Sequence, residues 1–137
     1  MLTLTKTFHF AASHTLHNPN WSQEKNEQIF QKCARLHGHN YVLEVTVCGP
    51  INPDTGMVMN ATELSAVVKE SIIDELDHRD LNSDIVWLEG KITTAENLNE
   101  AIWNRLAPMF AQRSDDVSLY ELKLWETPKM CVSRRAG

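Results

Sequence analysis

The stretch HGHNYVLEVTV, residues 37–47, places alternate side chains on opposite sides from Tyr41 onward, which is typical of a β-strand. Its apolar face carries Tyr41, Leu43, Val45 and Val47, whereas Glu44 and Thr46 lie on a polar face. Residues 2–11 alternate in the same way, with Leu2, Leu4, Phe8 and Phe10 on the apolar face. We therefore predict strands over residues 2–11 and 39–48, each with one face toward a core and one toward water.

Two helices are predicted after these strands. Asn60-Ala61-Thr62-Glu63 has the residues of a capping box, and Thr93-Thr94-Ala95-Glu96 repeats that signature. Apolar stripes of helical spacing follow them, made of Leu64, Val67, Val68, Ile72 and Leu76, then of Leu98, Ile102, Trp103 and Leu106. We expect Pro108 to help end the second helix. Ser22 is placed to cap a shorter helix through Phe30.

The chain closes with a predicted strand over residues 117–126 and a short one over Met130–Arg135. The order β-β-α-α-β-β predicts an α+β fold, in which one antiparallel sheet carries both helices on one face. No further element is left to cover the other face, so self-association is expected.

Length and composition limit the class of protein. A chain of 137 residues predicts a single domain over 1–137, because domains average about 150 residues. The net charge of −5 argues against nucleic acid as a partner. No apolar run approaches the roughly 18 residues of a membrane span, and the N-terminus lacks the apolar centre of a signal peptide. We expect a cytoplasmic protein whose cysteines are thiols.

The sequence contains six histidines, and His37-Gly38-His39 opens the second predicted strand. Residues two apart on a strand point to the same side, about 6.5–7 Å apart. If the first two strands pair antiparallel, His14 comes to lie beside them, and three imidazoles with an open fourth position form a catalytic zinc site. One alternative is a closed structural zinc site with Cys33 as the fourth ligand, and another is a set of unrelated surface histidines. We favour the open site, because a domain with two helical stripes does not need a structural metal.

Other residues are candidates for proton transfer or ligand binding. Cys33 lies among cationic neighbours beside the predicted metal, which favours the thiolate. Asp77 could orient His78 as a proton shuttle, although a polar helix terminus is the simpler interpretation. Glu126 shares the parity of inward-facing strand residues and could accept two adjacent N–H groups of a ligand, or be a solvated strand end. His9 and His17 are interpreted as surface residues.

These motifs together resemble the 6-pyruvoyltetrahydropterin synthase family, which includes the queuosine-pathway 6-carboxytetrahydropterin synthases. The resemblance runs from Phe8 to about Arg135. Its motifs are Phe10–His14, Cys33–Tyr41, Pro53–Asn60, Leu76–Asn82, Thr93–Asn97 and Trp125–Thr127.

The resemblance implies the tunnelling fold, trimers that stack into a hexamer, and active sites at subunit interfaces. It places the zinc ligands at His14, His37 and His39, the catalytic thiol at Cys33, the proton-transfer pair at Asp77 and His78, and the pterin anchor at Glu126, with Thr94 and Glu96 lining the pocket. In the family, the Asp-His pair comes from a neighbouring subunit.

The resemblance also implies 7,8-dihydroneopterin triphosphate as substrate, Zn²⁺ as the only cofactor, and loss of triphosphate. The three-residue gap between Cys33 and His37 favours the 6-carboxytetrahydropterin product, with release of acetaldehyde, in the queuosine pathway. The loop Leu16–Lys32 and the stretch Gly56–Asn60 are closer to the branch that makes 6-pyruvoyltetrahydropterin for biopterin. We prefer the 6-carboxy product by a small margin.

Two rival classes remain open. A non-catalytic zinc- or pterin-binding subunit would not need Cys33, Asp77 and His78 together. A zinc hydrolase that uses only the three histidines would leave Cys33 and Glu126 without roles.

Overall fold

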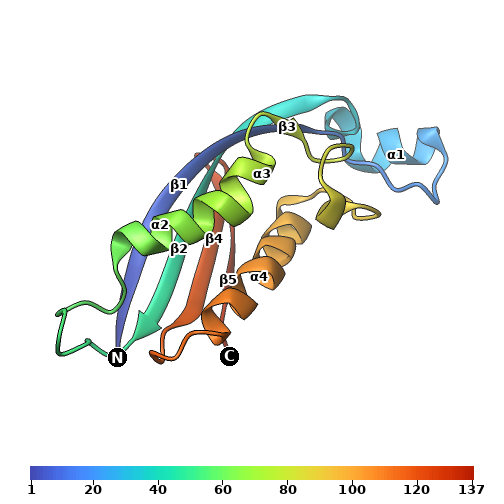
Figure 1. Cartoon of the computed structure of the whole chain (residues 1–137). Coiled ribbons are helices and arrows are strands. Elements are labelled where there is room, and N and C mark those ends of the chain that lie inside the picture. The colour runs from blue at the N-terminus through green and yellow to red at the C-terminus, as the bar shows by residue number, and fades with distance from the viewer.

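The computed structural model describes residues 1–137 and is built around a five-stranded sheet in the order β3-β1-β2-β4-β5 (Figure 1). The strands are β1 (Leu2–His14), β2 (His37–Gly49), β3 (Arg79–Asp80), β4 (Ser118–Thr127) and β5 (Met130–Arg135). Neighbouring strands pair antiparallel, except that the short β3 runs parallel to the end of β1. The predicted α+β class is confirmed, and β3 is an addition that no alternation in the sequence indicates.

Of the four α-helices, α2, α3 and α4 lie across one face of the sheet, and α1 projects beyond it (Figure 1). The bounds are α1 (Gln23–Phe30), α2 (Ala61–Val68), α3 (Asp74–Leu76) and α4 (Ala95–Ala111). A π-helical turn over Lys69–Ile73 joins α2 to α3, so the first predicted long helix is one continuous helical segment. The projecting helix is α1, which leads into a 3-10 turn over Gln31–Ala34. None of the helices combines the length and the apolar character that crossing a membrane would need.

The core fills the space between the sheet and the three helices. It contains the apolar faces that the sequence predicts, including Phe8, Leu43, Leu64 and Ile102. The opposite face of the sheet carries Thr3, Thr7 and His9, which are exposed, and no helix covers it (Figure 1). Thr3, Thr7 and His9 are therefore available to water or to another copy of the chain, whereas Thr46 on the same face is buried and shares a hydrogen bond with Thr5.

β1 and β2 are longer than their alternation predicts. β1 continues to His14 and β2 already begins at His37, because these two residues form the last pair of the β1–β2 ladder. The local sequence Ser13-His14-Thr15 has the polar character of a loop, so only the pairing with the partner strand extends it. This extension carries both histidine-bearing ends into the rigid sheet.

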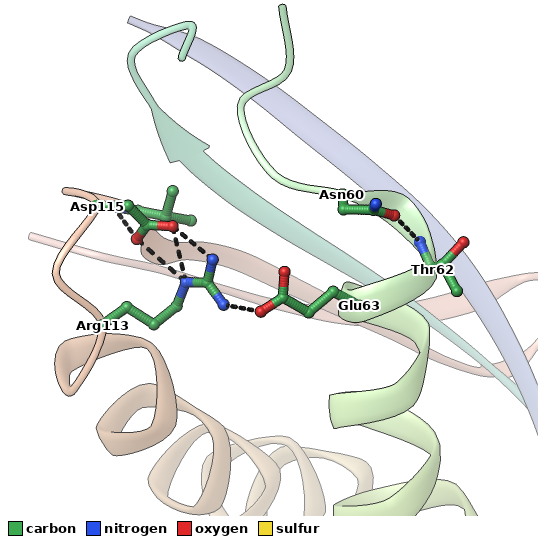
Figure 2. A network of polar contacts seen from close by, with 6 residues as sticks. Asn60, Thr62, Glu63, Arg113 and Asp115 are labelled. Atoms are coloured by element: carbon green, nitrogen blue, oxygen red, sulfur yellow. Dashed lines mark hydrogen bonds and ion pairs between the residues drawn. The ribbon is translucent and has the colours of Figure 1, made fainter. Parts of the chain in front are cut away.

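Side-chain caps begin the helices as predicted. Asn60 accepts a hydrogen bond from the Thr62 N–H at 2.9 Å (Figure 2), and Thr94 accepts one from the Asn97 N–H at 3.2 Å. Glu63 does not complete a capping box, because its carboxylate pairs with Arg113 instead (Figure 2).

Arg113 ties the end of α4 to the start of α2. Its guanidinium also binds Asp115 through two nitrogens, and these carboxylates raise the pKa of Arg113 (Figure 2). These contacts of Arg113 with Glu63 and Asp115 hold α2 and α4 together at the end of α4.

The expectation that Pro108 ends the second helix is wrong, since α4 continues to Ala111. A proline removes one backbone N–H from the helix ladder, but burial of a later side chain can outweigh that loss. Phe110 is the last residue but one of the helix and is almost fully buried, so its packing holds the last turn in place.

Candidate active site

Three histidines meet where β1 ends and β2 begins. His14 lies directly opposite His37 in the antiparallel ladder, and His39 lies opposite Ala12. The centroids of the His14 and His37 rings are 4.6 Å apart, and His39 lies 5.2 Å from His14. One ligand atom from each ring falls within 4.8 Å of the others. The predicted convergence of these histidines is therefore present in the fold.

Backbone carbonyls set the tautomer of two of these rings. His14 Nδ1 lies 2.8 Å from the Thr93 carbonyl, and His37 Nδ1 lies 2.7 Å from the Arg35 carbonyl. A carbonyl only accepts, so each ring donates from Nδ1 and keeps the lone pair on Nε2. Burial lowers the pKa of His14 to about 4, against the raising effect of the Thr93 hydrogen bond, so this ring is neutral at pH 7.

The cluster has the chemistry that a metal ion needs. The Nε2 atoms of His14 and His39 are buried and have no hydrogen-bond partner. Buried polar atoms without partners are costly, and a zinc ion with Zn–N distances of about 2.0–2.1 Å would satisfy both of them. Neutral imidazoles are also the form in which histidine binds metal. The residues present therefore fit a three-histidine zinc site.

Cys33 lies beside this cluster without joining it. It belongs to the 3-10 turn after α1 and is half-buried, and its carbonyl accepts a hydrogen bond from the Leu16 N–H at 2.9 Å. This bond places the Cys33 segment against the chain that leaves His14. The convergent group of ligand atoms contains the histidines alone, so the structure gives no support to a closed four-ligand site with Cys33.

Glu126 extends the cluster along the sheet. It lies at the end of β4, with Oε1 3.8 Å from His39 Nε2 and with a side chain that is 17% exposed. Its carboxylate has no hydrogen-bond partner in the protein, and burial followed by the charge of Glu126 raises the pKa of the neighbouring Tyr41. The inward orientation predicted for Glu126 is thus found, and its acceptor oxygens are free for a ligand.

The two other residues predicted for the pocket lie at the start of α4. Thr94 is the N-cap residue, so its hydroxyl oxygen already accepts the Asn97 N–H. Glu96 follows in the first turn and is exposed, without a hydrogen bond to Glu126 or to the histidines. The structure joins this turn to the cluster through Thr93, whose carbonyl holds His14.

Asp77 and His78 form a pair just before β3, beside the edge of β1 that does not pair with β2. Their side chains are 3.0 Å apart, and Asp77 Oδ1 accepts the Ala11 N–H at 2.9 Å. That N–H, followed by the contact with His78, lowers the pKa of Asp77. His78 has a φ of 62°, in the left-handed region that few residues other than glycine adopt, and its N–H donates to the Ala11 carbonyl at 2.6 Å.

No polar bond joins this pair to the histidine cluster. The His78 side chain is 83% exposed, and no hydrogen bond or ion pair links Asp77 or His78 to Cys33, Glu126 or the metal-ligand candidates. His78 and His39 do line a common cavity of about 570 Å³, together with Ser13, Asn40 and Arg79. Within one chain, the structure therefore assembles the histidines with Glu126 but leaves the Asp-His pair at the edge.

Sequence reasoning missed several contacts at this site. The Thr93 and Arg35 carbonyls hold two rings, and backbone acceptors leave no mark in the sequence. The alternation of the sequence places Tyr41 only on the apolar face, whereas the structure shows its hydroxyl buried without a partner beside Glu126. The tyrosine within an otherwise aliphatic stripe was the signal that could have singled it out.

Comparisons with known proteins agree with this geometry. The sequence model of the family described as 6-pyruvoyl tetrahydropterin synthase matches residues 3–136. A 6-pyruvoyl tetrahydrobiopterin synthase of Dictyostelium discoideum is 44% identical over 132 residues, which is 96% of this chain and 94% of that protein. A 6-carboxy-5,6,7,8-tetrahydropterin synthase of Haemophilus influenzae is 29% identical and covers 93% of this chain and 94% of its own length.

A solved structure shows the same fold. The 6-pyruvoyl tetrahydropterin synthase of Caenorhabditis elegans superimposes with a TM-score of 0.89 at 30% identity, covering 99% of this chain and 96% of that one. The family match and the relatives extend over nearly the whole chain, including every candidate residue of the site. The chain therefore belongs to the 6-pyruvoyl tetrahydropterin synthase family and is an enzyme of the pyruvoyl/carboxy-tetrahydropterin synthase type.

Proposed function

We propose that this enzyme converts 7,8-dihydroneopterin triphosphate to 6-pyruvoyltetrahydropterin with loss of triphosphate, and that it depends on zinc. The relative named for the 6-pyruvoyl product is 44% identical, whereas the relative named for the 6-carboxy product is 29% identical. Identity along the whole chain outweighs the short spacing between Cys33 and His37, so the 6-pyruvoyl product is favoured over the 6-carboxy product.

One observation carries the proposal. The unpartnered Nε2 atoms of His14 and His39 lie beside the free carboxylate of Glu126, with His39 Nε2 and Glu126 Oε1 3.8 Å apart. Residues that could hold a metal and an acceptor for paired N–H donors are thus adjacent, which suits a ligand with a pterin ring at one end and hydroxyl groups at the other. A zinc hydrolase would need only the metal.

The residues are proposed to divide the chemistry between them. Zinc held by His14, His37 and His39 would polarise an oxygen of the substrate side chain, where negative charge develops. Glu126 would accept two N–H groups of the pterin ring and fix its orientation, in a pocket that Thr94 and Glu96 also line.

Proton transfer is assigned to the thiol and to the Asp-His pair. Cys33 lies beside the metal site, where its thiolate would take a proton from the substrate side chain. His78, held by Asp77, would move protons on the opposite side of the same side chain. A pure pterin-binding subunit would use neither group.

We infer that the working unit is a homo-oligomer, a hexamer made of two trimers, in which one subunit supplies the Asp-His pair to the metal site of its neighbour. The pair lies on an exposed edge of its own chain, with the His78 side chain 83% exposed. The polar face of the sheet is uncovered as well (Figure 1). Both features support a site that is completed by another copy.

A product assay tests the reaction. Zinc-loaded protein is incubated with 7,8-dihydroneopterin triphosphate, and triphosphate, acetaldehyde and both tetrahydropterins are measured. Release of triphosphate with 6-pyruvoyltetrahydropterin is the expected result. Stoichiometric acetaldehyde would move the enzyme to the 6-carboxy branch, and absence of triphosphate release at full zinc occupancy would leave only a binding role.

Subunit mixing tests the shared site. Cys33→Ala and His78→Ala proteins are each expected to be inactive, and refolding them together should restore part of the activity, because some interfaces then carry both intact groups. Mass spectrometry of the mixed oligomers is the control. Mixed oligomers without any recovered activity would contradict the assignment of the pair to a neighbouring subunit.

A further inference from the structure

We propose that Thr93 and Asn82 are positioning residues, which hold the His14 imidazole in the orientation and tautomer that metal binding requires; this inference rests on the metal site proposed above. The role is assigned from a closed chain of hydrogen bonds that connects His14, Thr93, Asn82 and Thr15.

The first link joins His14 to Thr93. The His14 Nδ1 atom lies 2.8 Å from the Thr93 carbonyl oxygen and 3.4 Å from the Thr93 hydroxyl oxygen. Both residues are only 1% exposed, so no water replaces these contacts. Thr93 is thus placed to control the nitrogen that faces away from the metal site.

The second link joins Thr93 to Asn82. The Thr93 hydroxyl lies 3.4 Å from Asn82 Oδ1 and donates to it. The same oxygen accepts the Thr15 N–H at 2.8 Å, and Asn82 Nδ2 donates to the Thr15 carbonyl at 3.0 Å. Asn82 therefore binds both backbone groups of the residue that follows His14, and it also contacts the residue that holds the His14 ring.

The donors and acceptors in this series of hydrogen bonds can be assigned in only one way. The carbonyls of Thr93 and Asn82 cannot donate, so the hydroxyl of Thr93 must donate to Asn82 and the Nδ1 of His14 must donate to Thr93. The ring is thereby locked with its lone pair on Nε2, which is the buried atom without a partner in the cluster. Outer hydrogen bonds of this kind typically change metal affinity by about 10- to 100-fold when they are removed.

Asn82 also ends the segment that carries the Asp-His pair. This segment is attached to β1 by the β3 pairing and by a bond from the Leu81 N–H to the Ser13 carbonyl at 2.8 Å. Just beyond β1, the side-chain amide of Asn82 bonds to the N–H and the carbonyl of Thr15, as the backbone of a paired strand would do. The contacts of Asn82 therefore connect the segment that bears His78 with the end of β1 that bears His14.

The test compares zinc affinity among variants of the full chain. Thr93→Val, Thr93→Ser, Asn82→Ala and the Thr93→Val/Asn82→Ala double variant are titrated against a chromogenic zinc chelator. Thr46→Val and Asn52→Ala are matched controls, because Thr46 pairs its hydroxyl with Thr5 on the polar face and Asn52 caps a distant loop. Urea unfolding of each metal-free protein and the visible absorption of its Co²⁺ form provide readouts that are independent of activity.

Thr93→Val keeps the backbone carbonyl that accepts from His14 Nδ1 but removes the hydroxyl that contacts the ring and Asn82. Thr93→Val and Asn82→Ala are therefore each expected to weaken zinc binding by about 10-fold, at the low end of such effects, and to alter the Co²⁺ spectrum. Thr93→Ser should keep wild-type affinity, because it retains the hydroxyl. The double variant should lose less than the product of the single losses, since both substitutions break the same chain. The control variants should bind zinc as the wild type does.

Unchanged affinity and spectrum in Thr93→Val and Asn82→Ala would overturn the inference, and so would equal losses in the control variants. These outcomes differ from a failure of the proposed function. A wild-type protein that binds no zinc would overturn the metal site itself, whereas a wild-type protein that binds zinc, with variants that bind it equally well, would overturn only the positioning role.

Discussion

Glu126→Gln should weaken pterin binding without destabilising the fold. The substitution keeps the size of the side chain and one acceptor oxygen, but it replaces the second oxygen with an amide that cannot accept an N–H. One charge-assisted hydrogen bond to the ligand is then lost, which is worth about 1.5–3 kcal/mol. That free energy corresponds to a rise of about 10- to 150-fold in the Kd for a pterin.

Glu126→Gln should not lower the free energy of unfolding and is expected either to leave it unchanged or to raise it. Glu126 has no hydrogen-bond partner in the protein, and its nearest cationic candidate is the His39 ring at 3.8 Å. With the side chain 17% exposed, removing the charge relieves a desolvation cost that no partner offsets. The unfolding free energy of the metal-free protein should therefore stay the same or rise by up to about 1 kcal/mol.

Glu121→Gln is the matched control on the same strand. Glu121 lies on the polar face and pairs with Arg135 at 2.8 Å. Losing this ion pair should lower the unfolding free energy only slightly, because Arg135 is exposed to solvent, and should leave pterin binding unchanged. Pterin binding is followed by fluorescence titration, zinc content by elemental analysis, and stability by urea unfolding.

Two results would refute this reasoning. Unchanged pterin affinity in Glu126→Gln, with full zinc content, would remove Glu126 from ligand recognition. A loss of affinity that only parallels a loss of stability would mean that the carboxylate supports the fold instead.

Three further predictions concern other parts of the molecule. Cys33→Ala should retain zinc and lose triphosphate release, because the thiol lies outside the group of convergent ligand atoms; loss of zinc in elemental analysis would reinstate the cysteine as a ligand. Arg113→Met should lower the unfolding free energy by about 1 kcal/mol in low salt and by less in high salt, as its partners are partly exposed carboxylates, and a salt-independent effect in urea unfolding would argue against the ionic clamp. Because the folded-state pKa of Asp77 is lowered, the stability that its charge contributes is present above the pKa of an unfolded Asp and is lost as the pH falls through the folded-state value; Asp77→Asn should flatten the acid limb of a stability–pH curve, and an unchanged limb would contradict this assignment.

Alternation and helical spacing were sufficient to predict the layers of this fold. The apolar stripe from Tyr41 to Val47 and the stripes of the two helices are buried because burial follows side-chain periodicity directly. The ends of the elements depend on partners instead. The pairing of His14 with His37 lengthens two strands, and the burial of Phe110 carries α4 past Pro108.

The site could be predicted to the same extent. The histidines were found because a spacing of two on a strand, together with antiparallel pairing, fixes where side chains meet. The left-handed backbone of His78 and its contact with Ala11 were not predicted, since both arise when β3 docks on the edge of β1. The hydrogen bond from His14 to Thr93 spans 79 positions of the sequence and involves a backbone oxygen, so no local pattern encodes it.

The pairing of β1 with β2 has a consequence for how the chain reaches its native state. A slip of one residue between these strands would place Gly38 opposite His14 and send His37 and His39 to the other side of the sheet. An ion that requires all three rings can be bound only by the correctly aligned hairpin, so its binding free energy favours that alignment alone. The metal would thereby stabilise the native register of β1 and β2 during folding, before it has any part in catalysis.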